Sequence, residues 1–252
     1  MKLSYEQKQS MLEHGYVHVK DVIPKIMVDE ALRHINHSVG EGMNPADLPI
    51  FRSQSFCPEL QSTPPITDLF NRTPVKALVD DLIGADMTGH IGGGQVALRF
   101  PTLQDPPHRP GPHLDGTYSP TNGVKEGTIA NFTMLVGVLL SPVREANSGN
   151  FTVWPGTHQQ YEQYFREHGP ESLLKGLPKV EMPEPVQTMG EPGDVFLVHY
   201  QLAHGVAPNT SPFPRYAIFF RVKHIHHNED WKAPMTDIWL HWPGMKDIVS
   251  GK

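Results

Sequence analysis

A change in residue pattern at Gly92-Gly93-Gly94 limits the folds open to this chain more than any other feature. Before it, apolar residues recur at the three- and four-residue spacing that is typical of helices. After it, short apolar runs are separated by Pro, Gly and Asn, as in strands joined by turns. The 25 Pro and 22 Gly are spread along all 252 residues, which favours many short elements over a disordered tract. The pattern predicts an α+β, mainly β fold with N-terminal helices packed outside a strand-rich core.

Capping and turn residues predict where these elements begin and end. Ser4, with Gln7 three residues later, predicts a helix that ends at Gly15. Pro24 predicts the start of a second helix, which ends before Gly40. Further helices are predicted over 74–83 and in part of 160–183, and strands over 16–19, 95–100, 131–140, 150–154, 186–189, 195–200 and 215–224.

The composition excludes several classes of protein. The single cysteine, Cys57, can form neither an internal disulfide nor a Cys-rich metal site, so a metal would need His and carboxylate ligands. The net charge of −6 argues against nucleic-acid binding. Because we find no membrane-spanning apolar run and no secretory signal pattern, we expect a cytoplasmic protein without membrane contact. The length suits one domain, with a mainly helical part (1–90), a core (91–225) and a C-terminal extension (226–252).

His113, Asp115 and His204 form a candidate metal site. Alternation along a strand would place His113 and Asp115 on the same face. Two imidazoles and one carboxylate are the protein ligands of Fe(II) in the facial triad of non-haem oxygenases, which leaves coordination positions open. The His-x-Asp pair alone is a weak signal, because 15 His make chance pairs common. His227-x-Glu229 is another such pair, and no third ligand on a strand follows it.

The residues around His204 strengthen this interpretation. His204-Gly205 follows an apolar strand, and Arg215 begins another apolar strand eleven residues after His204. A buried charge without a partner is very costly, so Arg215 must meet an anion. Its planar guanidinium can hold a carboxylate through two hydrogen bonds. That anion is either a small carboxylate ligand or an Asp or Glu of the chain itself.

Taken together, these motifs resemble the phytanoyl-CoA dioxygenase (PhyH-like) family of Fe(II)/2-oxoglutarate oxygenases. The resemblance covers most of the chain. Four segments carry it, and their order and spacing match the family: Glu13 to Val19, His113 to Asp115, Asn147 to His158, and Pro192 to Arg215.

The resemblance implies a fold and a set of metal ligands. The fold is a double-stranded β-helix, a jelly-roll or cupin-like core. His113, Asp115 and His204 are implied to bind Fe(II). Arg215 is implied to hold the far carboxylate of 2-oxoglutarate, whose keto-acid end chelates the iron.

The resemblance also suggests neighbours of the cosubstrate. Gln95, and Asn131 or Thr133, would hydrogen-bond to it, although each could equally be an ordinary polar residue of a strand. The sequence departs from the family at Val206, where many members have a Ser that contacts the cosubstrate.

The activity that the resemblance implies is hydroxylation of a small organic substrate by O₂, coupled to conversion of 2-oxoglutarate to succinate and CO₂. Asp115 predicts oxygenation rather than halogenation, because halogenating members replace this carboxylate with a small residue. Two other interpretations stay open. One is a non-catalytic jelly-roll protein that binds a metal or a small acid. The other is a cupin-type metal-dependent isomerase or hydrolase, in which Arg215 would pair internally.

Other polar residues have more ordinary interpretations. His224, His226 and His227 are expected to form a solvated cluster at a strand exit. His199 is either a neighbour of the metal ligands or a core residue. We expect loops 41–65, 102–127 and 159–183 to shape the substrate pocket. In the second of these, His108 and Arg109 either meet an anionic substrate or are simply solvated.

Overall fold

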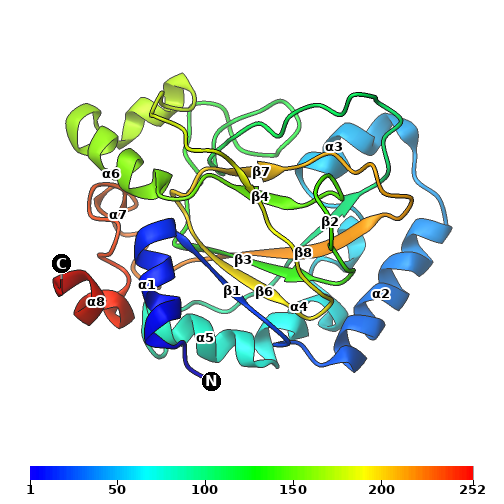
Figure 1. Ribbon diagram of the computed structural model, residues 1–252, viewed down its shortest axis with the longest axis horizontal. Helices are drawn as coiled ribbons and strands as arrows, with labels where there is room; N and C mark the ends of the chain where they lie inside the picture. Colours follow the sequence, from blue (N-terminus) through cyan, green and yellow to red (C-terminus); the bar gives the residue numbers. More distant parts are fainter. Residues whose placement is uncertain (252) are drawn as a thin grey trace.

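Two antiparallel sheets and eight α-helices make up the computed structural model, which describes residues 1–251 (Figure 1). The larger sheet has the strand order β1-β6-β3-β8-β2, and the smaller one has the order β5-β4-β7. The strands are β1 (Tyr16–Val19), β2 (Gln95–Arg99), β3 (Met134–Leu139), β4 (Phe151–Val153), β5 (Val186–Gln187), β6 (Val195–His199), β7 (His204–Val206) and β8 (Arg215–Val222). The predicted mixture of helices and sheets is therefore confirmed.

The helices lie mostly in the first ninety residues, with a second group late in the chain. They are α1 (Tyr5–His14), α2 (Lys25–Gly40), α3 (Leu48–Ser53), α4 (Pro64–Asn71), α5 (Pro74–Ile83), α6 (Thr157–His168), α7 (Ala233–Thr236) and α8 (Lys246–Ser250). Short 3-10 helices occur at Pro45–Asp47, Pro58–Leu60, Pro170–Lys175 and Pro243–Met245. None of the helices within residues 1–251 is both long and apolar enough to cross a membrane.

The predicted caps of α1 are present. The Ser4 side chain accepts a hydrogen bond from the backbone N–H of Gln7, and the Gln7 side chain accepts one from the backbone N–H of Ser4. Gly15 ends the helix in the left-handed region, with φ of 81°. The sequence prediction missed α3 and α4, which lie where turn residues dominate. Both begin with Pro in the first turn, where a missing N–H costs no helical hydrogen bond.

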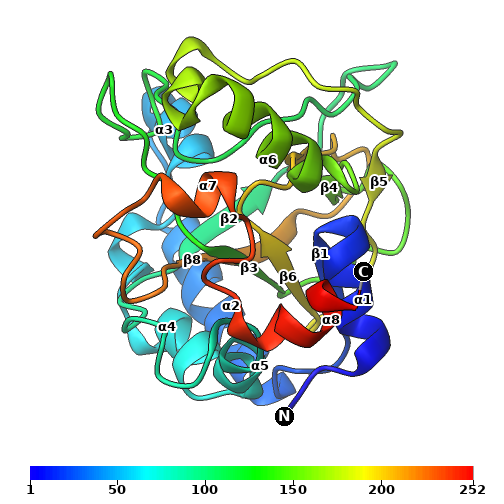
Figure 2. The same cartoon turned by 90° about the vertical axis from the view of Figure 1, so that its left-hand side faces the viewer.

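The larger sheet lies between two different layers (Figure 2). Its outer face packs against the N-terminal helices, and Ile218, Phe220 and Val222 of β8 belong to that core. Its inner face packs against the smaller sheet and α6 through residues such as Ala217 and Phe219. Alternation along β8 thus sends successive side chains to opposite layers. Arg215 and Arg221 have the same parity as Ala217 and Phe219, so they face the space between the two sheets.

Candidate metal centre

The three predicted metal ligands converge in the structure. One ligand atom from each of His113, Asp115 and His204 lies within 4.8 Å of the other two. Asp115 Oδ1 is 3.4 Å from His113 Nε2 and 3.6 Å from His204 Nε2. The side chains of Asp115 and His204 are 13% and 6% exposed, whereas that of His113 is 50% exposed. The group is therefore open on the His113 side only.

Backbone pairing brings the two distant histidines together. The N–H of His113 donates to the carbonyl of His204 at 2.9 Å, and the N–H of His204 donates back at 3.1 Å. His204 Nδ1 lies 3.0 Å from the carbonyl oxygen of Leu202, so it carries the proton and leaves Nε2 free to face Asp115. The two ladder hydrogen bonds therefore hold the two backbones side by side, and the side-chain hydrogen bond orients the imidazole of His204.

The expectation that His113 and Asp115 lie on one strand is wrong in detail. His113 forms an isolated bridge, and Asp115 lies in the turn that follows. That turn requires Gly116, whose φ is +86° and whose position leaves no room for a Cβ: it would lie 2.5 Å from the carbonyl oxygen of Ala130. The turn, and not strand alternation, aims the carboxylate at His204.

Arg221 contacts the candidate site, and the sequence analysis did not single it out. Its Nε and Nη2 lie 2.9 Å and 2.8 Å from Asp115 Oδ2, and its Nη1 donates to Gln95 Oε1 at 3.0 Å. Burial alone would raise the pKa of Asp115, but Arg221 and the two histidines hold that pKa well below its ordinary value. The signal that could have found Arg221 is its position six residues after Arg215 on the same strand, and so on the same face.

Arg215 is buried without a carboxylate. It is 2% exposed, and within residues 1–251 it forms no ion pair. Its guanidinium is fixed by backbone carbonyls instead: Nε donates to Gly149 O at 2.8 Å and Nη1 to Ala97 O at 3.0 Å. Burial and the nearby Arg99 lower the pKa of Arg215 to about 9. An internal salt bridge, one of the two possibilities for Arg215, is therefore absent from this part of the chain.

A cavity of about 370 Å³ joins these groups. His113, Asp115, His204, Arg215 and Gln95 all line it. Its other polar lining residues are Arg52, Ser53, Arg99, Thr117, Ser119, Asn122 and Arg221, and its apolar ones include Leu135, Phe151, Val206 and Phe219. Loops 41–65 and 102–127 contribute to this lining as predicted. Loop 159–183, the exposed His108 and the exposed Arg109 do not.

Asn131 and Thr133 do not reach this cavity, contrary to expectation. Asn131 donates to the carbonyl of Trp231 at 2.9 Å, and its Oδ1 lies 3.0 Å from His227 Nε2. Thr133 Oγ1 accepts a hydrogen bond from the N–H of His224 at 2.9 Å. Because β3 begins only at Met134, these two residues turn toward the C-terminal segment instead.

The predicted solvated histidine cluster is also wrong for two of its members. His224 and His227 are 9% and 1% exposed, and only His226 lies at the surface, beside Glu229. His224 stacks on His241 with ring centroids 4.4 Å apart. The reason is that the segment after β8 folds back and packs these rings together, which local sequence does not reveal. His199 is a core residue, bonded to Ile238 and Gln201.

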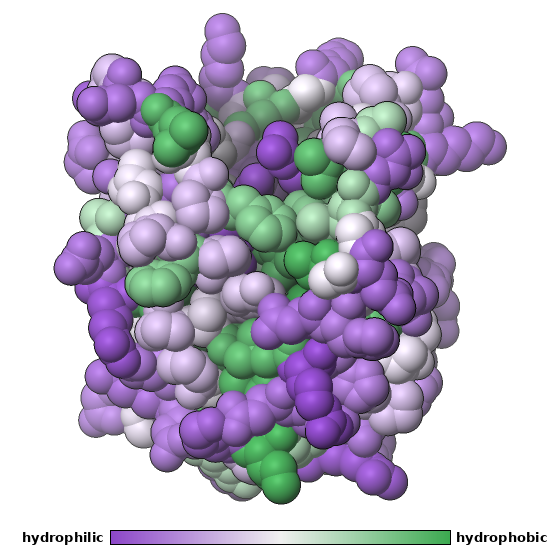
Figure 3. All heavy atoms as spheres, turned by 90° about the vertical axis from the view of Figure 1, so that its right-hand side faces the viewer, coloured by the Kyte–Doolittle hydropathy of each residue, from purple (hydrophilic) through white to green (hydrophobic). Residues whose placement is uncertain are grey.

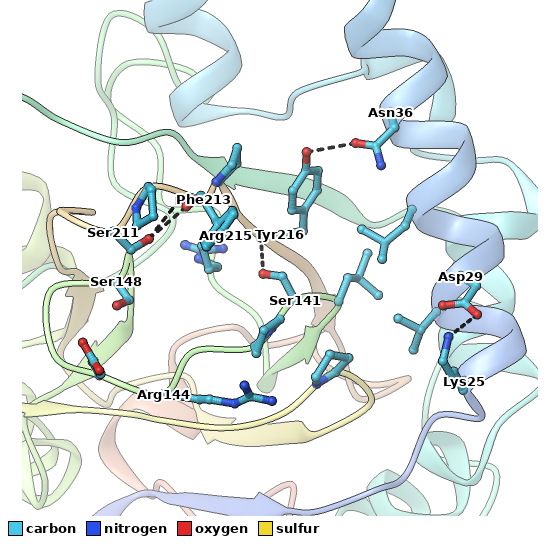
Figure 4. Close-up of a pocket in the computed structure, with 18 of the residues that line it drawn as sticks. Lys25, Asp29, Asn36, Ser141, Arg144, Ser148, Ser211, Phe213, Arg215 and Tyr216 are labelled. Carbon is cyan, nitrogen blue, oxygen red and sulfur yellow. Dashed lines mark hydrogen bonds and ion pairs between the residues drawn. The ribbon is translucent and has the colours of Figure 1, made fainter.

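A larger cavity, of about 1040 Å³, lies at the start of β8 beside α2 (Figure 4). On the side of the molecule where α2 lies, the surface is hollowed and shows apolar residues at its centre (Figure 3). Two of its lining residues are joined by a hydrogen bond, in which Tyr216 Oη donates to Asn36 Oδ1 at 2.9 Å. Within residues 1–251, the one group of three side chains suited to a metal is that of His113, Asp115 and His204, so the smaller cavity is the candidate site for chemistry.

Comparison with known protein families identifies the chain. The model of the family described as "Phytanoyl-CoA dioxygenase (PhyH)" matches residues 11–217. The chain belongs to the PhyH family. The PhyH match includes all three residues of the candidate metal site and Arg215, so the residues that suggested the family lie within the matched region. No protein of curated function matches the sequence.

Solved structures share the fold of this PhyH protein at low sequence identity. The carbocyclase SnoK from nogalamycin biosynthesis aligns with a TM-score of 0.54 and 20% identity, over 87% of this chain and 83% of SnoK. HygX from Streptomyces hygroscopicus, solved with nickel and 2-oxoglutarate, aligns with a TM-score of 0.56 and 16% identity, over 89% of this chain and 88% of HygX. The non-heme monooxygenase ThoJ aligns with a TM-score of 0.58 and 16% identity, over 86% of this chain and 77% of ThoJ.

Proposed function

We propose that this protein is an Fe(II)/2-oxoglutarate-dependent dioxygenase that hydroxylates a small organic substrate. The observation that carries this proposal is Arg215, a buried guanidinium that pairs with no carboxylate of residues 1–251 and lines the same cavity as His113, Asp115 and His204. A metal chelator with a second carboxylate would satisfy both ends of this cavity, and 2-oxoglutarate is such a molecule. Membership of the PhyH family and the metal and 2-oxoglutarate in the HygX structure support the same assignment.

We also propose that the two sheets form a double-stranded β-helix within a single domain that spans the chain. Their antiparallel pairing and the shared fold of the solved structures support this. The C-terminal residues belong to the same body, because Trp242 and Met245 pack in the core formed with the N-terminal helices. Lys8 of α1 also donates to the carbonyl of Gly244 at 3.1 Å. A cytoplasmic location remains a prediction from the sequence.

The residues fit the two groups that the proposal requires. Two neutral imidazoles and one carboxylate on one side of a metal suit Fe(II) and leave positions open for the cosubstrate and O₂. Arg215 would hold the far carboxylate of 2-oxoglutarate. When bound, the iron and 2-oxoglutarate supply oxidation by O₂, with release of succinate and CO₂.

The chain's own residues do the remaining work. Arg221 holds Oδ2 of Asp115, so Oδ1 would be the oxygen that binds the metal. Leu135, Phe151 and Phe219 line the cavity with apolar surface, which excludes water from the metal. The polar side chains of Ser53, at the end of α3, and Asn122, on a loop, line the cavity and would orient a small substrate.

An anaerobic titration tests the metal and the cosubstrate together. Adding Fe(II) and then 2-oxoglutarate to the protein is expected to produce a weak visible charge-transfer band, because the keto acid chelates the iron. The Asp115→Ala/His204→Ala double variant is expected to lose the band. As a control, His226→Ala/Glu229→Ala removes an exposed imidazole–carboxylate pair and should leave the band intact.

Two results would contradict the proposal: no band in the wild type, or a band that persists in the double variant. Hydroxylation itself is tested by screening small molecules for stimulated succinate release under O₂. The product is expected to gain one oxygen atom derived from O₂. A halogenated product, or one that is only isomerised, would show that the site catalyses a reaction other than hydroxylation.

A further inference from the structure

Arg99 stands directly beside Arg215 in the cavity. The antiparallel pairing of β2 with β8 places Arg99 opposite Arg215, and both residues line the cavity. Gly149 lies against both side chains, because a Cβ added there would be 3.0 Å from the Cβ of Arg99 and 3.1 Å from that of Arg215. The side chains of Arg99 and Arg215 therefore leave neighbouring strands side by side, on the face that points into the cavity.

This pair is electrostatically unfavourable by itself. Like charges directly opposite one another on paired strands destabilise a sheet. Within residues 1–251, Arg99 forms neither an ion pair nor a side-chain hydrogen bond, and the guanidinium of Arg215 meets only backbone carbonyls. Burial and Arg52 lower the pKa of Arg99, as burial and Arg99 lower that of Arg215. An anion between the two guanidiniums would relieve this repulsion.

The position of Arg99 and Arg215 relative to the metal ligands indicates which part of a bound anion they would hold. Arg215 and Arg221 are six residues apart, or about 20 Å along an extended strand. Arg221 is occupied by Asp115 at the metal end, so Arg99 and Arg215 mark the end remote from the metal. Two of the five N–H donors of the Arg215 guanidinium are already hydrogen-bonded to the carbonyls of Gly149 and Ala97. Only the remaining donors can bind a ligand. Val206, which also lines the cavity, adds no hydrogen bond.

We propose that Arg99 and Arg215 together form a two-guanidinium site for the far carboxylate of the 2-oxo diacid. This rests on the proposed function, because the diacid is the cosubstrate proposed above. Arg215 supplies the buried, backbone-fixed donor, and Arg99 supplies the second donor from the neighbouring strand. Arg52 of α3, at the same end of the cavity, adds positive potential that attracts the dianion.

Binding of 2-oxoglutarate to the Ni(II)-loaded protein, measured by calorimetry, tests this site. Arg99→Met is expected to weaken binding about 10- to 100-fold, as for the loss of a hydrogen bond to a charged group. Arg99→Lys, which keeps the charge, should lose less. Arg109→Met removes an exposed arginine of a loop outside the cavity lining and should leave the affinity unchanged.

A keto acid without the far carboxylate, 2-oxopentanoate, separates contact from structural support. It lacks the group that Arg99 binds, so Arg99→Met should not weaken its binding further. The ligand-free Arg99→Met protein should unfold at a temperature no lower than the wild type, since a like-charge contact is removed. Its gain in unfolding temperature on adding 2-oxoglutarate should be smaller.

Equal affinity of Arg99→Met and wild type for 2-oxoglutarate would overturn the inference and leave the proposed function standing. Equal loss for 2-oxoglutarate and 2-oxopentanoate would also overturn it, because Arg99 would then act only as structural support. A wild-type protein that binds metal but no 2-oxoglutarate would overturn both the inference and the proposed function.

Discussion

At the scale of single residues, the two oxygens of Asp115 have different neighbours. Oδ1 faces His113 and His204, whereas Oδ2 accepts hydrogen bonds from Arg221. The hydroxyl of Tyr200 also donates to the backbone carbonyl of Asp115 at 3.2 Å. A carboxylate held in this way cannot swing to bind a metal through both oxygens. If a metal binds here, Asp115 would therefore contribute one oxygen to it.

We expect Arg221→Met to weaken metal binding about 10- to 100-fold, as is typical when a group that orients a metal ligand is removed. The affinity for Ni(II), measured by competition with a chelator, checks this. Arg144→Met is the matched control, because Arg144 forms a comparable pair with Glu191 on the surface. Unchanged affinity in Arg221→Met would show that Asp115 is held by the turn alone.

At the scale of elements, the site depends on how the segment that ends at His113 lies against β7. This segment makes only a single bridge, and the close approach of the two backbones requires Gly205. A Cβ at Gly205 would lie 2.4 Å from the carbonyl oxygen of Gly111. Glycine is therefore needed here for close packing rather than for backbone conformation.

Gly205→Ala is expected to push this segment away from β7. It should cost about 1–3 kcal/mol of unfolding free energy, as overpacking of a tight contact usually does. It should also weaken Ni(II) binding, because His113 and His204 move apart. Urea unfolding and metal titration measure the two effects. Gly111→Ala provides the control, since its Cβ would meet no atom within 4 Å. Similar behaviour of the two variants would contradict this explanation.

At the scale of the whole molecule, buried neutral histidines tie the C-terminal segment to the core. His199 Nδ1 accepts a hydrogen bond from the N–H of Gln201, so its Nε2 donates to the carbonyl of Ile238, at 3.0 Å in each case. Burial lowers the pKa of His199, His224 and His227 to about 4 in each case. Protonation of any of these rings would place a charge inside the fold.

Stability should therefore decrease as the pH falls from about 6.5 toward 4. In this range the unfolded chain binds protons at these histidines and the folded protein does not, so acid favours unfolding. The urea midpoint, measured at several pH values between 7 and 4.5, checks this before most carboxylates titrate. His199→Phe should reduce the slope against pH, whereas the exposed His37→Gln should not. A midpoint independent of pH over this range would contradict the prediction.

The sequence by itself determined the features that depend on local pattern. Helix caps such as Ser4 and Gly15, strand runs, and the spacing of His113, Asp115, His204 and Arg215 can all be read along the chain, and they led to the family. Two predicted cosubstrate neighbours, Asn131 and Thr133, were misplaced, because the sequence did not show that β3 begins only at Met134.

Only the tertiary structure decided which distant side chains meet. Arg99 stands beside Arg215 because the register of β2 with β8 sets that pair, and Arg221 of β8 reaches Asp115 in the turn after His113. The register depends on cross-strand hydrogen bonds and packing between segments more than one hundred residues apart, which no local pattern encodes. The burial of His224 and His227 has the same cause, since the chain after β8 turns back onto the core.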